Sequence, residues 1–215
     1  REALIDRVLG GAGRPLHGFV SPAHLGAVDV DPSEGYDPDM ARRLLSEAGF
    51  PDGLMLEVDC PTRLPDEAFA LTDALGEQLQ RIGITLRRHV IEDRTAYAEA
   101  VRDKRIHDMC LFDSSPMSTF RVLYEKIDSR QAGAWWQGYS NPEVEARLDA
   151  ARMEPDPVKR EDLHKANFNA LRRDPPWLTL YNHLVATVIR GGHDGWHMRP
   201  DGILDVTRLP PLTAT

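Results

Sequence analysis

The turn Asp113-Ser114-Ser115, which follows an apolar run, holds the side chains best suited to bind a small molecule. Its two hydroxyls can form hydrogen bonds, and exposed N–H groups at the start of the next helix can hold an anion, with Arg121 adding positive charge. Asp113 or Ser115 could instead serve as the N-terminal cap of that helix. Both roles stay open, because helix caps at strand ends are also where α/β proteins bind ligands.

A glycine-flanked loop carries three large aromatic residues, Trp135, Trp136 and Tyr139. Their faces could stack on a sugar ring or pack against an aliphatic ligand. At least one tryptophan is expected in the core instead, because large aromatic side chains dominate core burial. Arg63, in the loop after the first strand of the main α/β region, is a further binding candidate, although a solvated loop arginine is the simpler interpretation.

Metal and nucleophile chemistry have little support in the sequence. His193 and His197 are four positions apart, but they lie in a glycine-rich loop rather than on a helix, so their side chains need not converge. Ser114 and Ser115 lie in no Gly-x-Ser-x-Gly elbow, and the phosphate-binding and dinucleotide-binding glycine motifs do not occur. We therefore predict no catalytic residue, no bound metal and no cofactor.

The composition is that of a globular chain with an acidic balance. Its 215 residues are 41% hydrophobic, enough for a core, and its formal net charge is −8. Binding to nucleic acid needs a concentrated basic face, so the charge argues against nucleic acid as a partner. No apolar run approaches the roughly 20 residues of a membrane span. Cys60 and Cys110 are expected to be buried free thiols, with one bridge between neighbouring strands as the alternative.

Strands and helices alternate along residues 36–127. The expected helices cover residues 37–48, 71–82, 95–102 and 118–127, and the expected strands cover residues 54–59, 84–91 and 106–112. In the first of these helices, Ala41, Leu44, Leu45 and Ala48 are expected to face inward. This order predicts βαβ units, a largely parallel sheet and functional loops at the carboxyl ends of the strands.

Two capped helices follow from Tyr139, and a further helix opens the chain at residues 1–9. Asn141 and Asp156 each precede a proline at the first helical position. The expected apolar stripes are Val144, Leu148 and Ala151 on the first helix, and Leu163, Ala166, Ala170 and Leu171 on the second. A double proline ends the second helix, and residues 177–181 and 184–189 are predicted to be partner strands.

Several segments give nearly the whole chain a family likeness. They read REALIDRVLGGAGRPLHGFVSP, YDPDMARRLLSEAGFPDG, LGEQLQRIGITLRRHV, YSNPEVEARLD with DPPWLTLY, and GWHMRPDG. In this order they resemble family 5 extracellular solute-binding proteins, the dipeptide, oligopeptide and nickel receptors of ABC importers. The resemblance implies the carboxyl-terminal lobe of a two-lobed, hinged receptor, with an α/β fold of the type II periplasmic-binding-protein class and a mixed, mostly parallel sheet flanked by helices.

The resemblance also implies the organisation and partners of the chain. Residues 1–35 would form a connecting helix and crossover, residues 36–190 the solute-binding lobe, and residues 191–215 a loop and C-terminal tail. The facing amino-terminal lobe would be missing, any targeting segment would lie upstream, and the lone lobe would bind its solute weakly or not at all. The receptor would be a monomer, periplasmic or extracellular and membrane-associated, that delivers a small-molecule solute to the membrane permease of an ABC importer.

In related receptors, the loop after the third strand of this lobe carries a glycine-tryptophan and acidic pattern that contributes to the ligand cleft. The loop here reads CLFDSSPMSTFRVL, so the tryptophan is absent and Asp113 is the only carboxylate in the turn. Asp113 could pair with an amine of the solute, and the departure from the pattern argues against a plain peptide as the ligand. The solutes that the resemblance implies are a peptide, an opine, a sugar conjugate or a similar small molecule.

Two other classes of protein stay open beside this non-enzymatic receptor. One is the ligand-sensing module of a transcriptional regulator, which a helix-turn-helix upstream would indicate. The other is a hydrolase that uses Asp113 and a nearby serine, which turnover abolished by Asp113→Asn would indicate.

Overall fold

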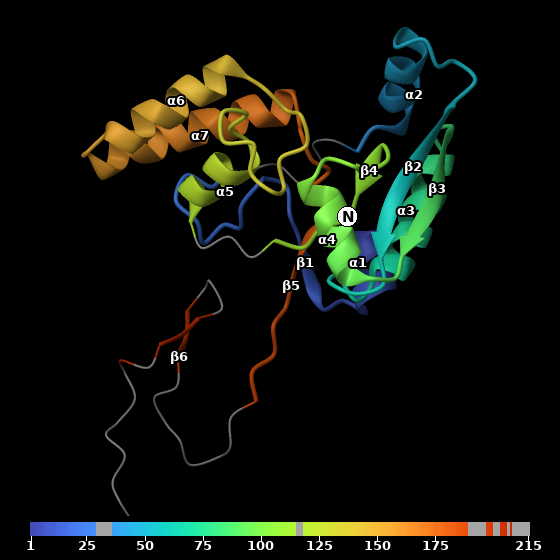
Figure 1. Cartoon of the computed structure of the whole chain (residues 1–215), viewed down its shortest axis with the longest axis horizontal. Helices are drawn as coiled ribbons and strands as arrows, with labels where there is room; N and C mark the ends of the chain where they lie inside the picture. The colour runs from blue at the N-terminus through green and yellow to red at the C-terminus, as the bar shows by residue number, and fades with distance from the viewer. Residues whose placement is uncertain (29–35, 115–117, 189–196, 200–202, 206, 208–215) are drawn as a thin grey trace, which may run out of the picture.

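A computed structural model describes residues 1–28, 36–114, 118–188, 197–199, 203–205 and 207 of the chain. Figure 1 shows two neighbouring groups of elements, one built around a parallel sheet and the other around a pair of long helices. The candidate binding residues lie where the last strand of the sheet leads into the helical group.

The sheet has the strand order β3-β2-β4, and all its strands are parallel. β2 (Leu54–Pro61) pairs along its full length with β3 (Ile84–Ile91), while β4 (Met109–Cys110) pairs with Val58 and Asp59 of β2. α3 (Ala68–Gln80) connects β2 to β3, and α4 (Arg94–Arg102) connects β3 to β4. The predicted βαβ units and parallel sheet are confirmed, but β4 is shorter than the predicted residues 106–112.

One face of the sheet is covered by α3, and α1 (Glu2–Leu9) packs against α3. Leu71, Ala74 and Leu75 of α3 are buried against Leu4 of α1, and Leu86 of β3 packs on the same cluster. This apolar contact fixes the helix on the sheet, because burying such side chains is the main favourable term in folding.

The second group consists of α5 (Thr119–Lys126), α6 (Pro142–Met153) and α7 (Pro157–Arg173). α6 and α7 lie side by side as a helical hairpin (Figure 1). Both predicted caps are confirmed, since Asn141 accepts hydrogen bonds from the N–H groups at the start of α6 and Asp156 does so for α7. Their shared core contains Phe19, Val20, Val122, Leu123, Ile127, Val144, Leu148, Phe168, Ala170 and Leu171.

The predicted apolar stripe of α7 is only partly right. Ala170 and Leu171 are buried, but Leu163 and Ala166 are half-exposed, and the rest of the buried face is His164, Asn167 and Phe168. Two of these are polar, so in the first half of the helix the apolar pattern pointed to Leu163 and Ala166 although the buried positions are the next residues, His164 and Asn167.

α2 (Pro38–Glu47) begins after the predicted cap Asp37, but its apolar face does not point inward. Every residue of α2 is at least partly exposed, including Leu44 at 53%, and the helix extends away from the sheet (Figure 1). It is held near its base, where a guanidinium N–H of Arg42 donates to the carbonyl of Arg81 at 2.8 Å. The inward-facing prediction is therefore wrong in this structure.

The strand predicted at residues 177–181 is shifted, and its partner is different. β5 (Tyr181–His183) pairs antiparallel with β1 (Gly13–Pro15), a strand that the sequence did not indicate. Residues 184–188 form no strand, and residue 189 lies outside the described residues. Trp177 packs against the helical core instead. β6 (His197–Met198) and β7 (Leu204–Asp205) form a separate antiparallel pair.

Cys60 and Cys110 are free thiols, one buried and the other half-buried. In the β2–β4 register Cys110 lies opposite Asp59, so Cys60 points to the other face of the sheet. Burial raises the pKa of both thiols, that of Cys110 to about 11. The expectation of unbridged cysteines is confirmed. Among the helices of the described residues, none is long and apolar enough to span a membrane.

Candidate functional site

The candidate site lies at the carboxyl edge of the parallel sheet. Because the three strands run in the same direction, the loops after β2, β3 and β4 all emerge at this edge. The hydroxyl of Thr62 donates to the carbonyl of Glu92 at 3.2 Å and joins the first two loops. Arg63 follows β2 and is exposed, while Asp113 and Ser114 follow β4 and are also exposed. Ser115 lies outside the described residues.

A nearly buried ammonium group lies beside the β4 turn. Lys126, the last residue of α5, is 8% exposed, and its Nζ donates a hydrogen bond to the hydroxyl of Ser114. The same Nζ lies 5.8 Å from the centre of the Phe112 ring. A buried cation is costly unless anionic or polar partners surround it, so Lys126 marks this turn as a place suited to an anionic group.

Several charges act on the pKa of Lys126. Desolvation by burial lowers it, and this is the largest effect. The carboxylates of Glu125 and Asp113 oppose that shift, while the guanidinium of Arg121 adds to it. Asp113 and Arg121, both candidates from the sequence, are thus near enough to influence the same ammonium group.

The helix after the turn is capped by Ser118, whose hydroxyl accepts from the N–H of Arg121 at 3.2 Å. Asp113 is therefore not the cap that the alternative interpretation required. Arg121 donates from Nε to a carboxylate oxygen of Glu125 one turn later at 2.7 Å. This ion pair along α5 orients the guanidinium of Arg121, which was expected from the sequence to help bind an anionic ligand.

Three aromatic side chains in contact, Phe112, Trp135 and Trp177, lie next to the turn. The ring of Phe112 stacks on Trp135 with 5.0 Å between the ring centres, and it meets the edge of Trp177 at 5.4 Å. Trp177 in turn contacts Phe19 of the helical core at 5.7 Å. Trp135 is therefore brought next to the candidate site. Trp135 and Trp136 are both half-buried and belong to neither core cluster, so the expectation that at least one tryptophan of this loop packs in the core is not confirmed.

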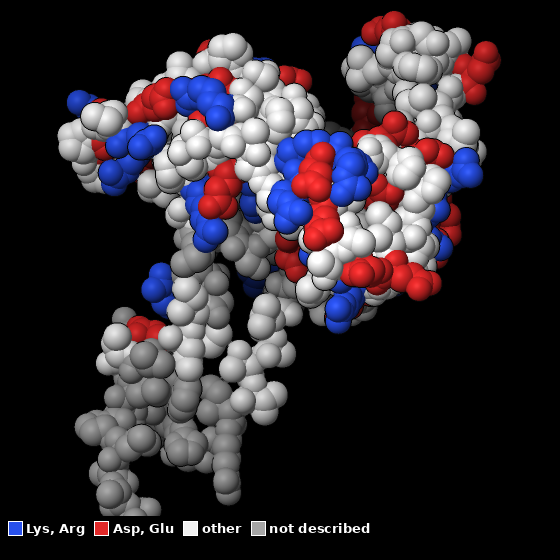
Figure 2. Space-filling model, in the orientation of Figure 1, with Lys and Arg blue, Asp and Glu red and all other residues white. Residues whose placement is uncertain are grey.

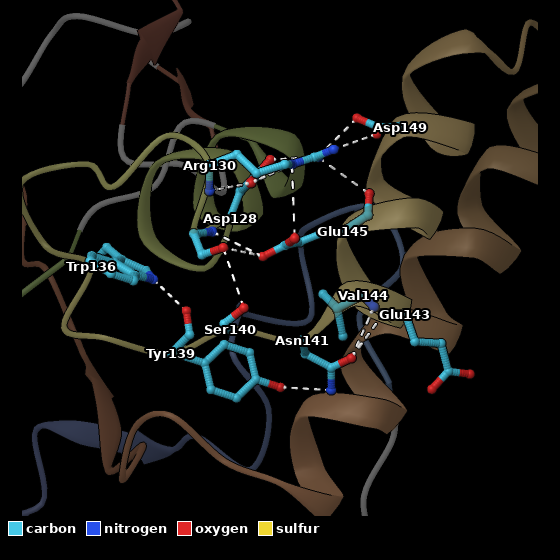
Figure 3. A network of polar contacts seen from close by, with 11 residues as sticks. Asp128, Arg130, Trp136, Tyr139, Ser140, Asn141, Glu143, Val144, Glu145 and Asp149 are labelled. Atoms are coloured by element: carbon cyan, nitrogen blue, oxygen red, sulfur yellow. Dashed lines mark hydrogen bonds and ion pairs between the residues drawn. The ribbon is translucent and has the colours of Figure 1, made fainter.

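Trp136 and Tyr139 hold the shape of their own loop. The indole N–H of Trp136 donates to the carbonyl of Tyr139 at 2.5 Å (Figure 3), and the ammonium of Lys104 lies 5.7 Å from its ring centre. The Tyr139 hydroxyl accepts from the side-chain amide of Asn141 at 3.2 Å, and its ring packs on the helical core. Both side chains therefore make contacts that hold this loop in place.

A polar network anchors the start of this loop to α6. The guanidinium of Arg130 donates two hydrogen bonds to the buried carboxylate of Asp128, at 2.9 and 2.8 Å, and also contacts the carboxylates of Glu145 and Asp149 (Figure 3). These hydrogen bonds raise the pKa of Arg130 further above its already high value. The network fixes the path of the chain from α5 to α6 and thereby the position of the aromatic loop.

The charges on the visible face are mixed. In Figure 2, basic and acidic side chains lie next to one another near the centre of the view and over the long helices. Their fields partly cancel at a distance, so recognition of a charged group depends on individual side chains such as Lys126.

Sequence reasoning missed Lys126 and Phe112. A signal for Lys126 was present, because Thr119, Val122 and Leu123 share its helical spacing and are all buried. A lysine in a core position of an amphipathic helix is unusual and could have been singled out. Phe112 was visible as an apolar residue, but nothing in the sequence indicated which aromatic residues would surround it.

The fold is that of solute-binding proteins. The structure of HbpA2 from Haemophilus parasuis aligns with a TM-score of 0.78 at 17% identity, covering 93% of this chain and 40% of that one. The periplasmic binding protein DppA from Helicobacter pylori, solved in complex with the peptide STSA, aligns with a TM-score of 0.69 at 23% identity, covering 83% of this chain and 35% of that one. The predicted fold class, a type II periplasmic-binding-protein lobe, is confirmed.

The family follows from the sequence match. The family model described as "Bacterial extracellular solute-binding proteins, family 5 Middle" matches residues 1–121, more than half of the chain. The chain belongs to this family of solute-binding proteins.

Curated relatives extend the match over almost the whole chain. The "Glutathione-binding protein GsiB" of Salmonella typhi is 26% identical over an alignment of 209 positions, which covers 94% of this chain and 40% of the relative. The "Di/tripeptide-binding protein 2" of Pseudomonas aeruginosa is 27% identical over an alignment of 220 positions, which covers 97% of this chain and 40% of the relative. The chain thus spans about 40% of the length of these relatives, which are binding proteins rather than enzymes.

Proposed function

We propose that the chain supplies one wall of the solute site in the receptor of an ABC importer. The observation that carries this proposal is the presence of one carboxylate and one ammonium group at the carboxyl edge of the sheet. Asp113 is exposed there, and the nearly buried ammonium of Lys126 is held next to Ser114. Family membership supports the same function, and neither the fold nor the site favours the transcriptional regulator.

The solute class that fits this wall is a small amino-acid derivative, such as a short or modified peptide or an opine. Its amine would pair with Asp113, and its carboxylate would accept hydrogen bonds from Lys126 and Ser114. An apolar portion would rest on the ring pair of Phe112 and Trp135. The names of the relatives, which refer to glutathione and to di- and tripeptides, support a solute that carries both an amine and a carboxylate.

The remaining length of the relatives would supply the facing lobe, and closure of the two lobes would exclude water from the solute. Residues 36–190 would form the lobe in this chain, residues 1–35 the connection, and residues 191–215 a tail. Ser114, Ser115 and Arg121 would contribute hydrogen bonds at the turn, and Arg63 would reach the site from the loop after β2. The receptor would act as a monomer outside the cytoplasmic membrane, dock on a membrane permease and release its solute unchanged.

Calorimetry on two proteins tests the proposal. The 215-residue chain and a full-length receptor that contains it are each titrated with glutathione, a dipeptide and an opine. We expect millimolar or weaker binding to the chain, because the facing wall is absent, and micromolar or tighter binding to the full-length protein. Tight stoichiometric binding by the chain alone would contradict the shared cleft.

Substitutions in the full-length receptor test the assignment of residues. A charge-assisted hydrogen bond is worth about 1.5–3 kcal/mol, so Asp113→Asn and Lys126→Met should each raise Kd about 10- to 100-fold. Asp52→Asn and Lys159→Met, at exposed positions elsewhere, are the matched controls. Unchanged affinity in both site variants would refute the site. Hydrolysis of the bound solute that Asp113→Asn abolishes would favour an enzyme instead.

A further inference from the structure

A cluster of imidazole and carboxylate groups lies on the sheet, on the side opposite α3. Side chains alternate between the faces of a strand, and Arg88 of β3 reaches Thr72 and Asp73 of α3. Its neighbour His89 therefore points to the other face, and Glu57 and Asp59 of β2 share that face. His107, just before β4, joins them there. The proposed solute site at the strand ends makes no use of this cluster.

We propose that Glu57, His89 and His107 form a binding site for a divalent transition-metal ion such as Zn²⁺. Their candidate ligand atoms all lie within 4.8 Å of one another. Nε2 of His89 is 3.1 Å from Oε1 of Glu57, and Nε2 of His107 is 3.9 Å from Oε2. Ligands of a tetrahedral zinc ion lie about 3.3 Å apart, given metal–ligand bonds of about 2.0–2.1 Å, so both distances are close to the spacing that zinc requires.

The orientation of His107 is that of a metal ligand. Its Nδ1 lies 2.7 Å from Oδ1 of Asp59, and its backbone N–H donates to the other carboxylate oxygen at 3.0 Å. Asp59 is only 1% exposed, so it can hold the imidazole in one orientation. In the neutral tautomer that donates Nδ1–H to Asp59, the lone pair is on Nε2, the ring nitrogen near Glu57. Metal-binding histidines almost always donate their other ring N–H to a carboxylate, a backbone carbonyl or water, and Asp59 would be such a partner.

His89 provides a second observation. Its Nε2 is shielded from solvent and forms no well-aligned hydrogen bond within the described residues, although Glu57 is close. The rings of His89 and His107 are stacked, with 4.1 Å between centres and 2° between planes. The lone pairs of the two rings therefore lie in parallel planes, so at least one ring must rotate before both Nε2 atoms can bind the same ion.

The ligand set selects the class of metal. Two imidazoles and one carboxylate suit Zn²⁺, Ni²⁺ or Co²⁺, whereas Ca²⁺ and Mg²⁺ require shells of oxygen ligands. The side chains of Glu57, His89 and His107 are 30%, 30% and 45% exposed, which leaves an open side for ion entry and for a water ligand. Arg87, which contacts Glu57 at 3.2 Å, is 61% exposed and can turn away.

Zinc titration of the EDTA-treated, tag-free 215-residue protein against a chromogenic chelator tests the site. We expect one tightly held Zn²⁺ per chain and a rise in Tm on adding zinc. His89→Gln and His107→Gln should each weaken binding at least 100-fold. Asp59→Asn, which acts through His107, should weaken it 10- to 100-fold. Circular dichroism of each variant establishes that the fold is retained.

Two controls separate this cluster from other histidines. His183 makes a 2.6 Å contact with Glu67 but has no second imidazole in its group, so His183→Ala should bind zinc like the parent. A double variant, His193→Ala with His197→Ala, removes the other pair that the sequence suggests and should also bind normally. If the parent takes up no zinc, or if His89→Gln and His107→Gln bind it as tightly as the parent, the proposal is overturned.

Discussion

Replacing Phe168 by alanine should cost the chain a large part of its stability. Phe168 is fully buried at the centre of the helical core, and its ring lies nearly parallel to that of Phe19, with 6.4 Å between the centres. Truncating a buried phenylalanine to alanine costs about 3–5 kcal/mol. Phe19 packs against this ring and is 8% exposed, so its ring can move into part of the space, and we expect the lower half of this range, about 3–4 kcal/mol.

The corresponding fall in Tm is about 6–16 °C, since each kcal/mol shifts Tm by about 2–4 °C in a protein of this size. Thermal and urea denaturation followed by circular dichroism measure it. The matched control is Phe69→Ala, because Phe69 is 37% exposed and lies under the guanidinium of Arg88. Phe69→Ala should lower the free energy of unfolding by about 1 kcal/mol or less. Equal losses in the two variants would refute the packing described for α7.

Three further substitutions probe the buried cation, a cap and a glycine. Lys126→Met should be more stable than the parent at pH 7, because burial holds the pKa of Lys126 below its usual 10.5. The difference in unfolding free energy between the two proteins should narrow as the pH rises toward 10.5, since the lysine then becomes neutral in both the folded and the unfolded chain. A difference that stays constant with pH would contradict this. Asn141→Ala removes the cap of α6 and should cost about 1 kcal/mol in urea denaturation, whereas no change would mean that the cap is dispensable. Gly53→Ala would place a methyl group 2.4 Å from the carbonyl oxygen of Gly83. It should lower Tm much more than Gly49→Ala does, because Gly49 has a similar positive φ but open space around it. Equal falls in Tm would refute the close approach of Gly53 to Gly83.

The sequence predicted the parallel sheet and the capped helices because local chemistry decides them. β3 matches the predicted range from Ile84 to Ile91, and Asn141 and Asp156 cap the helices as expected. Apolar alternation, prolines and capping side chains act over a few residues, so a single sequence carries them.

The failures arise where distant residues decide the outcome. β5 pairs with β1, and no local pattern links Gly13 to His183. The apolar face of α2 indicated burial, but no local signal tells whether another element will cover it. The Glu57, His89 and His107 cluster depends on strand register, which brings together residues from three separate segments.

The pairing of β1 with β5 also governs how the chain can fold. A hydrogen bond of 2.9 Å from Nε of Arg1 to the carbonyl of Thr179 reinforces it across 178 positions of sequence. Closing so long a loop costs about 2.5 kcal/mol more entropy than closing a ten-residue one, at about 0.6 kcal/mol per doubling. Contacts of this range form late unless the intervening segments have already folded. We therefore expect the sheet and the helical hairpin to form first and β1 and β5 to pair last. That last step would make the folding of the whole chain cooperative.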